Sequence, residues 1–374
     1  MKRVNISQVD AVFTSGRYPI EFLFFYDRPF STKRLKRGLR RLTLLFWPAF
    51  GEYQDGRIVF HRTGEAAFYD EESVDREFDA GEAGQGTTEV LSRFALPELE
   101  RLFFLKVVHF RNGLVLIPKL SHLAGDGYSY FLFLAALAAL TRPSIIPFRA
   151  QVMKRTIRPD HRRTARRDFL FRGAAPKLPL REGPLTVIQE EVPRRDVQAV
   201  VREAASSAGP RISGNDVLSA LAMKRFVEAG AGPGGEGVRL TIPIDVRGKV
   251  KEYGRGYFGN ALMFHTLTLN RTDLEKAPVG DIARTIRRSL PPLTRETYLE
   301  YLKSLDEMIS SGRLDMLRPY DPERGCLVTN LSRLPSDRLD FGTGPPRLVV
   351  PLTIERNGAA ILARGENYLL RYAY

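Results

Sequence analysis

Residues 119–127 read Lys-Leu-Ser-His-Leu-Ala-Gly-Asp-Gly, a turn that places His122 four residues before Asp126. A strand-like run over 113–118 leads into this turn, and an apolar run over 128–140 that favours a buried helix follows it. A histidine at the mouth of such a unit can be held rigidly with one ring nitrogen free to take a proton. His122 is therefore the first candidate for a catalytic base.

The composition limits the classes of protein that fit. With 374 residues the chain is long enough for two domains, and its apolar fraction of 43% is ordinary for a globular protein. The single cysteine, Cys326, excludes an internal disulfide and a cysteine-based zinc site, and no two histidines stand at metal-ligand spacing. The longest apolar run, the eleven residues 130–140, is too short for a membrane span, and the N-terminus lacks a signal core. We expect a cytoplasmic protein without a metal.

The net charge of +14 indicates anionic partners, and much of it is concentrated in one stretch. Residues 142–181 contain twelve Lys or Arg, two Asp and five Pro, which predicts an extended basic crossover. The stretch fits a solvated linker, an anion-docking surface or a peripheral membrane contact. In the second and third interpretations the contacts would be made by four arginines, Arg162, Arg163, Arg166 and Arg167. A nucleic-acid-binding protein is disfavoured because the chain has no helix-turn-helix, zinc or aromatic RNA-binding motif.

Strand and helix patterns alternate in both halves of the chain, which predicts an α/β protein of two domains with mixed sheets and flanking helices. We expect the first domain over residues 1–170, with the histidine turn and the basic crossover, and the second over 171–374. Helix caps and hairpin turns are expected at Ser31, Asp55-Gly56, Asn112-Gly113, Ser213 and Asn357-Gly358.

Three further motifs accompany the histidine turn. They are Ile-Pro-Ile-Asp-Val-Arg at 242–247, Gly-Tyr-Phe-Gly-Asn-Ala at 256–261, and Val-Thr-Asn-Leu-Ser-Arg at 328–333 with Asp-Phe-Gly-Thr-Gly at 340–344. In this order they resemble the BAHD acyltransferases, which belong to the wider superfamily of chloramphenicol acetyltransferase and condensation domains. The resemblance covers nearly the whole chain and implies two related domains with an active-site channel between them.

The resemblance implies transfer of an acyl group from a thioester to a hydroxyl or amine, with His122 as general base. It offers Thr329 as hydrogen-bond donor to the oxyanion, although a β-branched residue also suits a strand for its own sake. The expected donor is acyl-CoA or an acidic acyl carrier protein, the expected acceptor is a small molecule or lipid, and no permanently bound cofactor is expected. The alternatives are a freestanding condensation-type enzyme and a non-catalytic anion-binding or scaffold member.

The resemblance also assigns supporting residues near the histidine turn. It implies that Asp126 points away from the substrate and pairs with an arginine, and Arg247 is the candidate, because a buried carboxylate needs a partner. Gly127 is expected to let the chain turn into the following helix.

Four more residues complete the predicted site. Asn260 and Asn330 are expected to line the substrate channel, with a turn cap as the other interpretation of Asn260. Asp340 and Gly342 are expected to lie away from the reacting groups and to brace the contact between the domains.

Overall fold

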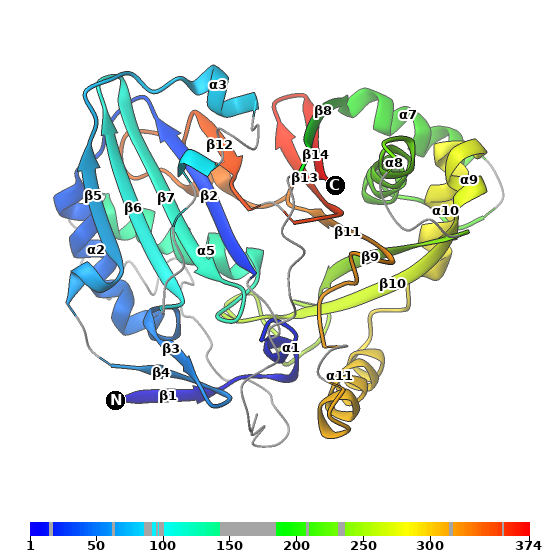
Figure 1. Cartoon of the computed structure of the whole chain (residues 1–374), viewed down its shortest axis with the longest axis horizontal. Coiled ribbons are helices and arrows are strands. Elements are labelled where there is room, and N and C mark those ends of the chain that lie inside the picture. Colours follow the sequence, from blue (N-terminus) through cyan, green and yellow to red (C-terminus); the bar gives the residue numbers. More distant parts are fainter. Residues whose placement is uncertain are drawn as a thin grey trace.

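The computed structural model describes residues 1–14, 18–61, 64–85, 92–94, 96, 101–142, 185–206, 209–230, 236–313, 317–353 and 355–374. The predicted domain boundary at residue 170 and the four arginines from Arg162 to Arg167 lie outside these residues. The described chain forms a five-stranded sheet and a six-stranded sheet, with a small three-stranded sheet near the N-terminus. Figure 1 shows the two large sheets side by side, each with helices against it.

The five-stranded sheet has the strand order β12-β2-β7-β6-β5. Alternate residues of β2 face two different cores, because side chains of a strand point to opposite sides. Phe22 and Phe24 pack with the helices α2 and α5, while Leu23 and Phe25 pack on the other face. The elements of this half are β1 (Lys2–Asn5), α1 (Gln8–Ala11), β2 (Pro19–Tyr26), α2 (Thr32–Leu45), β3 (Glu52–Gln54), β4 (Arg57–Phe60), β5 (Tyr69–Ser73), α3 (Ala80–Gln85), β6 (Phe103–Phe110), β7 (Gly113–Ser121) and α5 (Gly127–Thr141).

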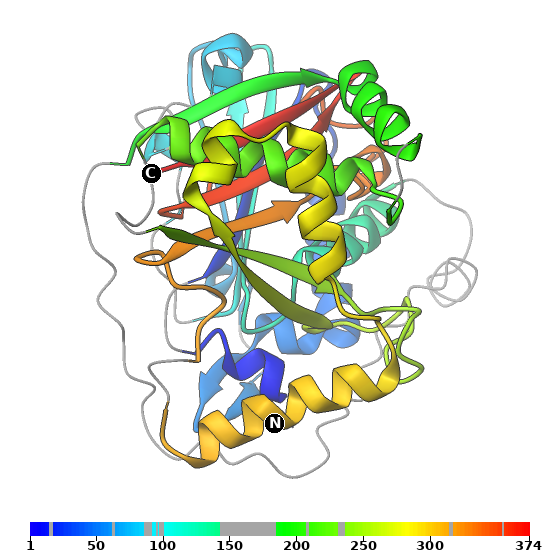
Figure 2. The same ribbon diagram turned by 90° about the vertical axis from the view of Figure 1, so that its right-hand side faces the viewer.

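The six-stranded sheet has the order β10-β9-β11-β13-β14-β8. One face is covered by α7, α8 and α10, as Figure 2 shows. Its elements are β8 (Val187–Pro193), α7 (Arg194–Ala205), α8 (Gly214–Glu228), β9 (Gly237–Asp245), β10 (Leu262–Asn270), α9 (Arg271–Lys276), α10 (Val279–Ser289), α11 (Arg295–Ser310), β11 (Gly325–Asn330), β13 (Gly358–Arg364) and β14 (Asn367–Ala373).

Several local predictions are confirmed. Ser31 caps α2, and Ser213 forms a capping box with Asp216 at the start of α8. The turns at Asp55-Gly56 and Asn112-Gly113 join β3 to β4 and β6 to β7.

Strand β12 (Leu348–Pro351) lies in the sheet of the other half of the molecule. It pairs antiparallel with β2, from Leu348 opposite Phe25 to Pro351 opposite Phe22. The chain then returns to the six-stranded sheet at β13. The prediction of a hairpin at Asn357-Gly358 is therefore wrong: the strands on either side belong to different sheets, and the hairpin is formed by β13 and β14.

Across the described part of the chain, no helix combines the length and the apolarity needed to span a membrane.

Candidate active site

A cavity of about 560 Å³ lies between the two large sheets. The face of the six-stranded sheet opposite α7, α8 and α10 forms one wall, where alternation places Thr329 of β11 and Ala360 of β13. The other wall comes from the N-terminal half and includes β2 and the turn after β7, with His122. The cavity therefore sits where the resemblance places a channel.

His122 is fixed by its backbone and by ring stacking. Its backbone N–H donates to the carbonyl oxygen of Tyr18 at 2.8 Å. Its ring stacks on Phe13, with centroids 4.2 Å apart and planes 15° from parallel. These contacts from the N-terminal segment set the plane of the imidazole.

Asn260 determines which nitrogen of His122 carries the proton. The Asn260 amide nitrogen Nδ2 donates to Asp10 Oδ1 at 2.8 Å and to the carbonyl oxygen of His122 at 2.7 Å. Because the carbonyl can only accept, the atom facing it must be the amide nitrogen, so Oδ1 faces His122 Nδ1 at 3.3 Å. An amide oxygen also only accepts, so Nδ1 carries the hydrogen. Nε2 is left with the free lone pair.

The prediction that Asn260 lines the channel is wrong. Its side chain is fully buried, and it is absent from the cavity wall because its three hydrogen-bonding contacts hold it behind His122. It does not cap a turn through its side chain; it positions the histidine.

Asp10 extends this support to the short helix α1. Its Oδ2 accepts from the backbone N–H of Ser7 at 2.7 Å in a capping box, while Oδ1 accepts from Asn260. One fully buried carboxylate thus connects the start of the chain to the support of the histidine.

The environment of His122 keeps its ring neutral. Burial lowers the pKa of His122 to about 4, against the opposing effects of the Asp126 charge and the Asn260 hydrogen bond, which raise it. The unprotonated form is therefore available over the whole neutral range.

Asp126 and Arg247 form the ion pair that was predicted. Arg247 Nη1 donates to Asp126 Oδ2 at 2.8 Å and Nη2 donates to Oδ1 at 3.0 Å, the bidentate geometry of a strong pair. Both side chains are 2% exposed. Burial raises the pKa of Asp126, but the charge and hydrogen bonds of Arg247 outweigh it and the pKa is lower than usual.

The remaining lone pairs of Asp126 are also used. Oδ1 accepts from the backbone N–H of Ser129, which makes Asp126 the N-cap of α5, and Oδ2 accepts from the N–H of Ala261. Asp126 therefore fixes the start of α5 against the turn that carries Asn260.

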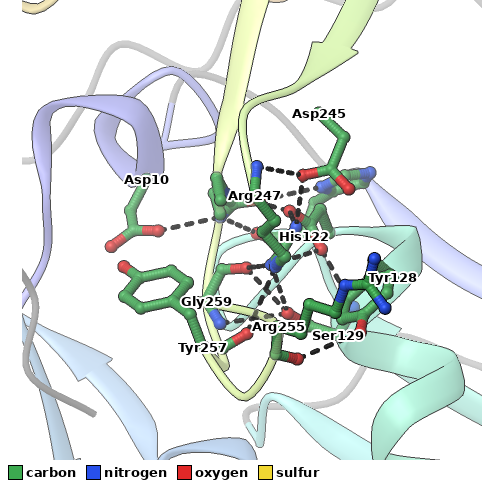
Figure 3. Close-up of polar contacts among 12 residues, drawn as sticks. Asp10, His122, Tyr128, Ser129, Asp245, Arg247, Arg255, Tyr257 and Gly259 are labelled. Carbon is green, nitrogen blue, oxygen red and sulfur yellow. Dashed lines mark hydrogen bonds and ion pairs between the residues drawn. The ribbon is translucent and has the colours of Figure 1, made fainter. Parts of the chain in front are cut away.

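Arg247 is the centre of this network (Figure 3). It also donates to Asp245 Oδ1 at 3.1 Å and to the carbonyl oxygen of Gly259 at 2.9 Å, and its guanidinium lies 4.6 Å from the ring centroid of Tyr128. Gly259 has a φ of +148°, and a Cβ there would stand 2.9 Å from the Tyr257 hydroxyl, so this close turn requires glycine.

Gly127 has a different role from the predicted one. It is the first residue of α5 and does not have the positive φ that demands glycine. A Cβ at this position would approach Leu334 to 3.6 Å, an ordinary contact, so the backbone does not need glycine to turn here. Gly127 lies in the cavity wall instead, where the missing side chain keeps space open.

The C-terminal motifs separate into two places. Thr329 and Asn330 line the cavity, and Asn330 Nδ2 donates to Asn215 Oδ1 at 2.7 Å. Asp340 lies outside the cavity wall, where its Oδ1 accepts from the N–H groups of Gly342 and Gly344 at 2.7 and 2.9 Å.

The Asp-Phe-Gly segment packs on the N-terminal half. Arg142 lies 3.7 Å from Asp340 and also donates to its carbonyl oxygen, and Phe341 stacks on Phe30 with centroids 4.6 Å apart. The φ of +114° at Gly342 permits this turn. These contacts hold the segment that leads into β12.

Three residues around the site were missed in the sequence: Asp10, Phe13 and Arg371. The capping-box pattern from Ser7 to Asp10 was readable, but nothing in it indicates a contact with residue 260. Arg371 is a buried cation on β14 in the cavity wall, and an arginine in a C-terminal strand carries no such signal by itself.

Within the described residues, no group of three His, Cys, Asp or Glu side chains is arranged to hold a metal ion. Cys326 is buried under the helices of the six-stranded sheet, and burial raises the pKa of its thiol to about 12. A thiol of this kind is a poor nucleophile.

Comparison with known proteins identifies the fold and the family. A family model described as "Transferase family" matches residues 76–367. Piperamide synthase of Piper nigrum is 22% identical over 356 residues, which cover 89% of this chain and 74% of that protein. Anthranilate N-benzoyltransferase protein 2 of Dianthus caryophyllus is 25% identical over 286 residues, 71% of this chain and 62% of that protein.

The fold is shared with a solved structure as well. F. sporotrichioides TRI101, solved in complex with coenzyme A and T-2, superposes with a TM-score of 0.73 at 13% identity, over 100% of this chain and 95% of that one. The extent of the family match, the related sequences and the shared two-sheet fold agree with the order of the motifs: the chain belongs to the BAHD acyltransferases.

Proposed function

We propose that this protein transfers an acyl group from acyl-CoA to an amine or hydroxyl acceptor, with His122 as general base. The single observation that carries the proposal is the Nδ1-protonated His122 in the wall of a cavity between two sheets. The relatives named above are a piperamide synthase and an anthranilate N-benzoyltransferase, and the second name favours amines as the first acceptors to test. The coenzyme A complex of TRI101 supports acyl-CoA as donor.

The chemistry needs few groups. The acceptor nitrogen or oxygen attacks the thioester carbonyl while His122 Nε2 takes its proton, which gives a tetrahedral intermediate with an oxyanion. The C–S bond then breaks, and the proton on Nε2 passes to the departing coenzyme A thiolate. Asp126 and Arg247 do not touch the substrate in this scheme; they hold the loop that aims His122.

The test is acceptor-dependent release of free coenzyme A thiol by the purified protein over a panel of acyl-CoA donors with primary amines and alcohols. We expect thiol release that rises with acceptor and a matching acylated product by mass spectrometry. Donor hydrolysis without an acylated product, or no turnover over the panel, would contradict the proposal.

Thr329 is proposed to stabilise the oxyanion. It lies in the cavity wall at the end of β11, and its hydroxyl can donate one hydrogen bond. Thr329→Val keeps the branched shape and removes the donor, so turnover should fall roughly 10²-fold or more. Thermal unfolding of the variant should stay close to that of the wild type. Unchanged turnover would leave Thr329 with a strand-forming role only.

Asn260→Leu is expected to lower the turnover number roughly tenfold or more with little change in KM. A tenfold fall corresponds to an activation barrier raised by about 1.4 kcal/mol, the contribution of one hydrogen bond. The reason is that Nδ1 of His122 loses its acceptor, so the tautomer with a free Nε2 is no longer enforced. Steady-state kinetics on the folded variant check this. Normal turnover in that variant would remove Asn260 from the positioning residues.

The acid limb of the kcat/KM profile should lie around pH 4, because burial lowers the pKa of His122 to about 4 and only the neutral ring accepts a proton. An unperturbed histidine would place the limb at about 6.5. The unfolded chain binds this proton from about pH 6.5 downward and the folded protein does not, so folding stability should also fall as the pH drops from there toward 4. An acid limb near 6.5 would contradict the assignment.

A further inference from the structure

One wall of the cavity carries a buried cation that no carboxylate of the described chain neutralises. Arg371 of β14 is 4% exposed and lines the cavity. Three acidic side chains of the cavity lie close to other cations: Asp126 and Asp245 pair with Arg247, and Glu21 lies 3.6 Å from Lys119. The fourth, Glu355, forms no ion pair with Arg371 among the described residues, and burial raises its pKa to about 7.

Most of the hydrogen-bonding capacity of Arg371 is unused. Nη1 donates to the carbonyl oxygen of Pro351 on β12, but Nε and Nη2 have no partner among the described residues. Burial lowers the pKa of Arg371 to about 10, so the guanidinium is still charged at neutral pH. A buried charge without a counter-charge is costly, and no ion pair within the described residues supplies one to Arg371.

The free edge of Arg371 matches a carboxylate. Nε–H and one Nη2–H lie parallel along one edge of a planar guanidinium, and a carboxylate accepts both in a bidentate contact. One carboxylate also balances the single positive charge, whereas a doubly charged phosphate would leave an excess of negative charge in the cavity.

The sheet register places Arg371 in line with the proposed oxyanion donor. Thr329 is opposite Ala360 across β11 and β13, and Ala360 is opposite Arg371 across β13 and β14. All three lie on the cavity face, and two strand spacings separate the outer two by about 10 Å. The methyl side chain of Ala360 leaves the space between them open. A short aliphatic or aromatic acid spans this distance.

We infer that Arg371 is a specificity-determining residue that binds a carboxylate carried by the acceptor or by the acyl group. This inference rests on the proposed acyl transfer and adds one chemical feature of the substrate to it. Arg371 sits on β14, which pairs with β13, and it donates a hydrogen bond to Pro351 of β12. Figure 1 shows β12, β13 and β14 close together between the two large sheets.

Binding of benzoate tests the inference without any turnover, with benzamide as its neutral isostere. By titration calorimetry the wild type should bind benzoate at least roughly tenfold more tightly than benzamide, the effect of hydrogen bonds to a charged group. Arg371→Met should abolish this difference and leave benzamide unchanged, while Arg364→Met, on β13 outside the cavity, should keep it. Equal binding of the two compounds, or no benzoate binding, would overturn the inference even if acyl transfer is observed.

A second measurement separates ligand binding from a purely structural role. Without ligand, Arg371→Met should melt at or above the wild-type temperature, because it removes an unpaired buried charge. A lower melting temperature together with an unchanged preference for benzoate would show that Arg371 only supports Pro351, and the inference would be wrong.

Turnover then identifies which substrate carries the carboxylate. We compare anthranilate with aniline as acceptors, and malonyl-CoA with propionyl-CoA as donors. For each pair we take kcat/KM for the acid divided by kcat/KM for its neutral partner. If Arg371→Met lowers this ratio tenfold or more for one pair, the substrate of that pair carries the carboxylate. If neither ratio changes, Arg371 does not recognise a substrate carboxylate.

Discussion

His122→Ala is expected to lower the turnover number by roughly 10²–10⁴-fold, the usual contribution of a general base. The expectation follows from geometry: Asn260 holds the hydrogen on Nδ1 and leaves Nε2 free, and stacking on Phe13 fixes the ring at the cavity wall. Acceptor-dependent release of coenzyme A thiol measures the loss.

The matched control is His109→Gln. His109 lies in β6, outside the cavity wall. Its side chain is 33% exposed, and its Nε2 lies 2.8 Å from Glu71 Oε1. This variant should keep wild-type turnover. If folded His122→Ala retained turnover within a factor of a few, the base would have to be another group.

Asp126→Asn is expected to lower the free energy of unfolding by about 3–5 kcal/mol, the cost of removing one partner from a buried ion pair. Arg247 would remain buried beside a neutral amide that offers one acceptor where the carboxylate offers two. Activity should fall as well, since Asp126 caps the helix that follows the histidine turn. Denaturant unfolding gives the first quantity and thiol release the second.

A double-mutant cycle isolates the pair itself. Asp126→Asn combined with Arg247→Met should be less damaged than the sum of the single variants, because the uncompensated charge is gone. The exposed pair Asp75–Arg111, 2.7 Å apart and 91% and 61% exposed, is the control and should show about 0–1 kcal/mol of coupling. Equal coupling energies in the two cycles would contradict a special role for the buried pair.

The centre of the site was predictable because its chemistry is local in the sequence. His122 and Asp126 occupy one turn, and Arg247 was identified through the family resemblance, in which this aspartate pairs with an arginine, with the need of a buried carboxylate for a partner as support. The support around them comes from elsewhere in the chain. Asp10 and Phe13 come close to the His122 site only through the tertiary fold. The hydrogen bonds of Asn260 turn its side chain toward the protein interior, whereas the prediction placed it in the channel.

The fold shows the same division between local and long-range information. The turn at Asn112-Gly113 joins adjacent strands, so two residues are enough to predict it. Asn357-Gly358 has the same composition, and Asn357 adopts a φ of +55°, but its neighbouring strands pair with partners far away in sequence. A dipeptide fixes the local backbone and carries no information on which sheet receives the next strand.

The crossing of β12 into the sheet of the N-terminal half has a consequence for biosynthesis. Strand β12 pairs along the edge of β2 that carries the apolar run from Phe22 to Phe25, so on the ribosome this edge lacks its β12 partner until Leu348–Pro351 have been translated. We expect this late pairing to make the emerging N-terminal half dependent on chaperones and truncated products prone to aggregate. It also means that the two halves cannot be separated by cutting the chain once: any split before residue 348 removes a strand from the first sheet.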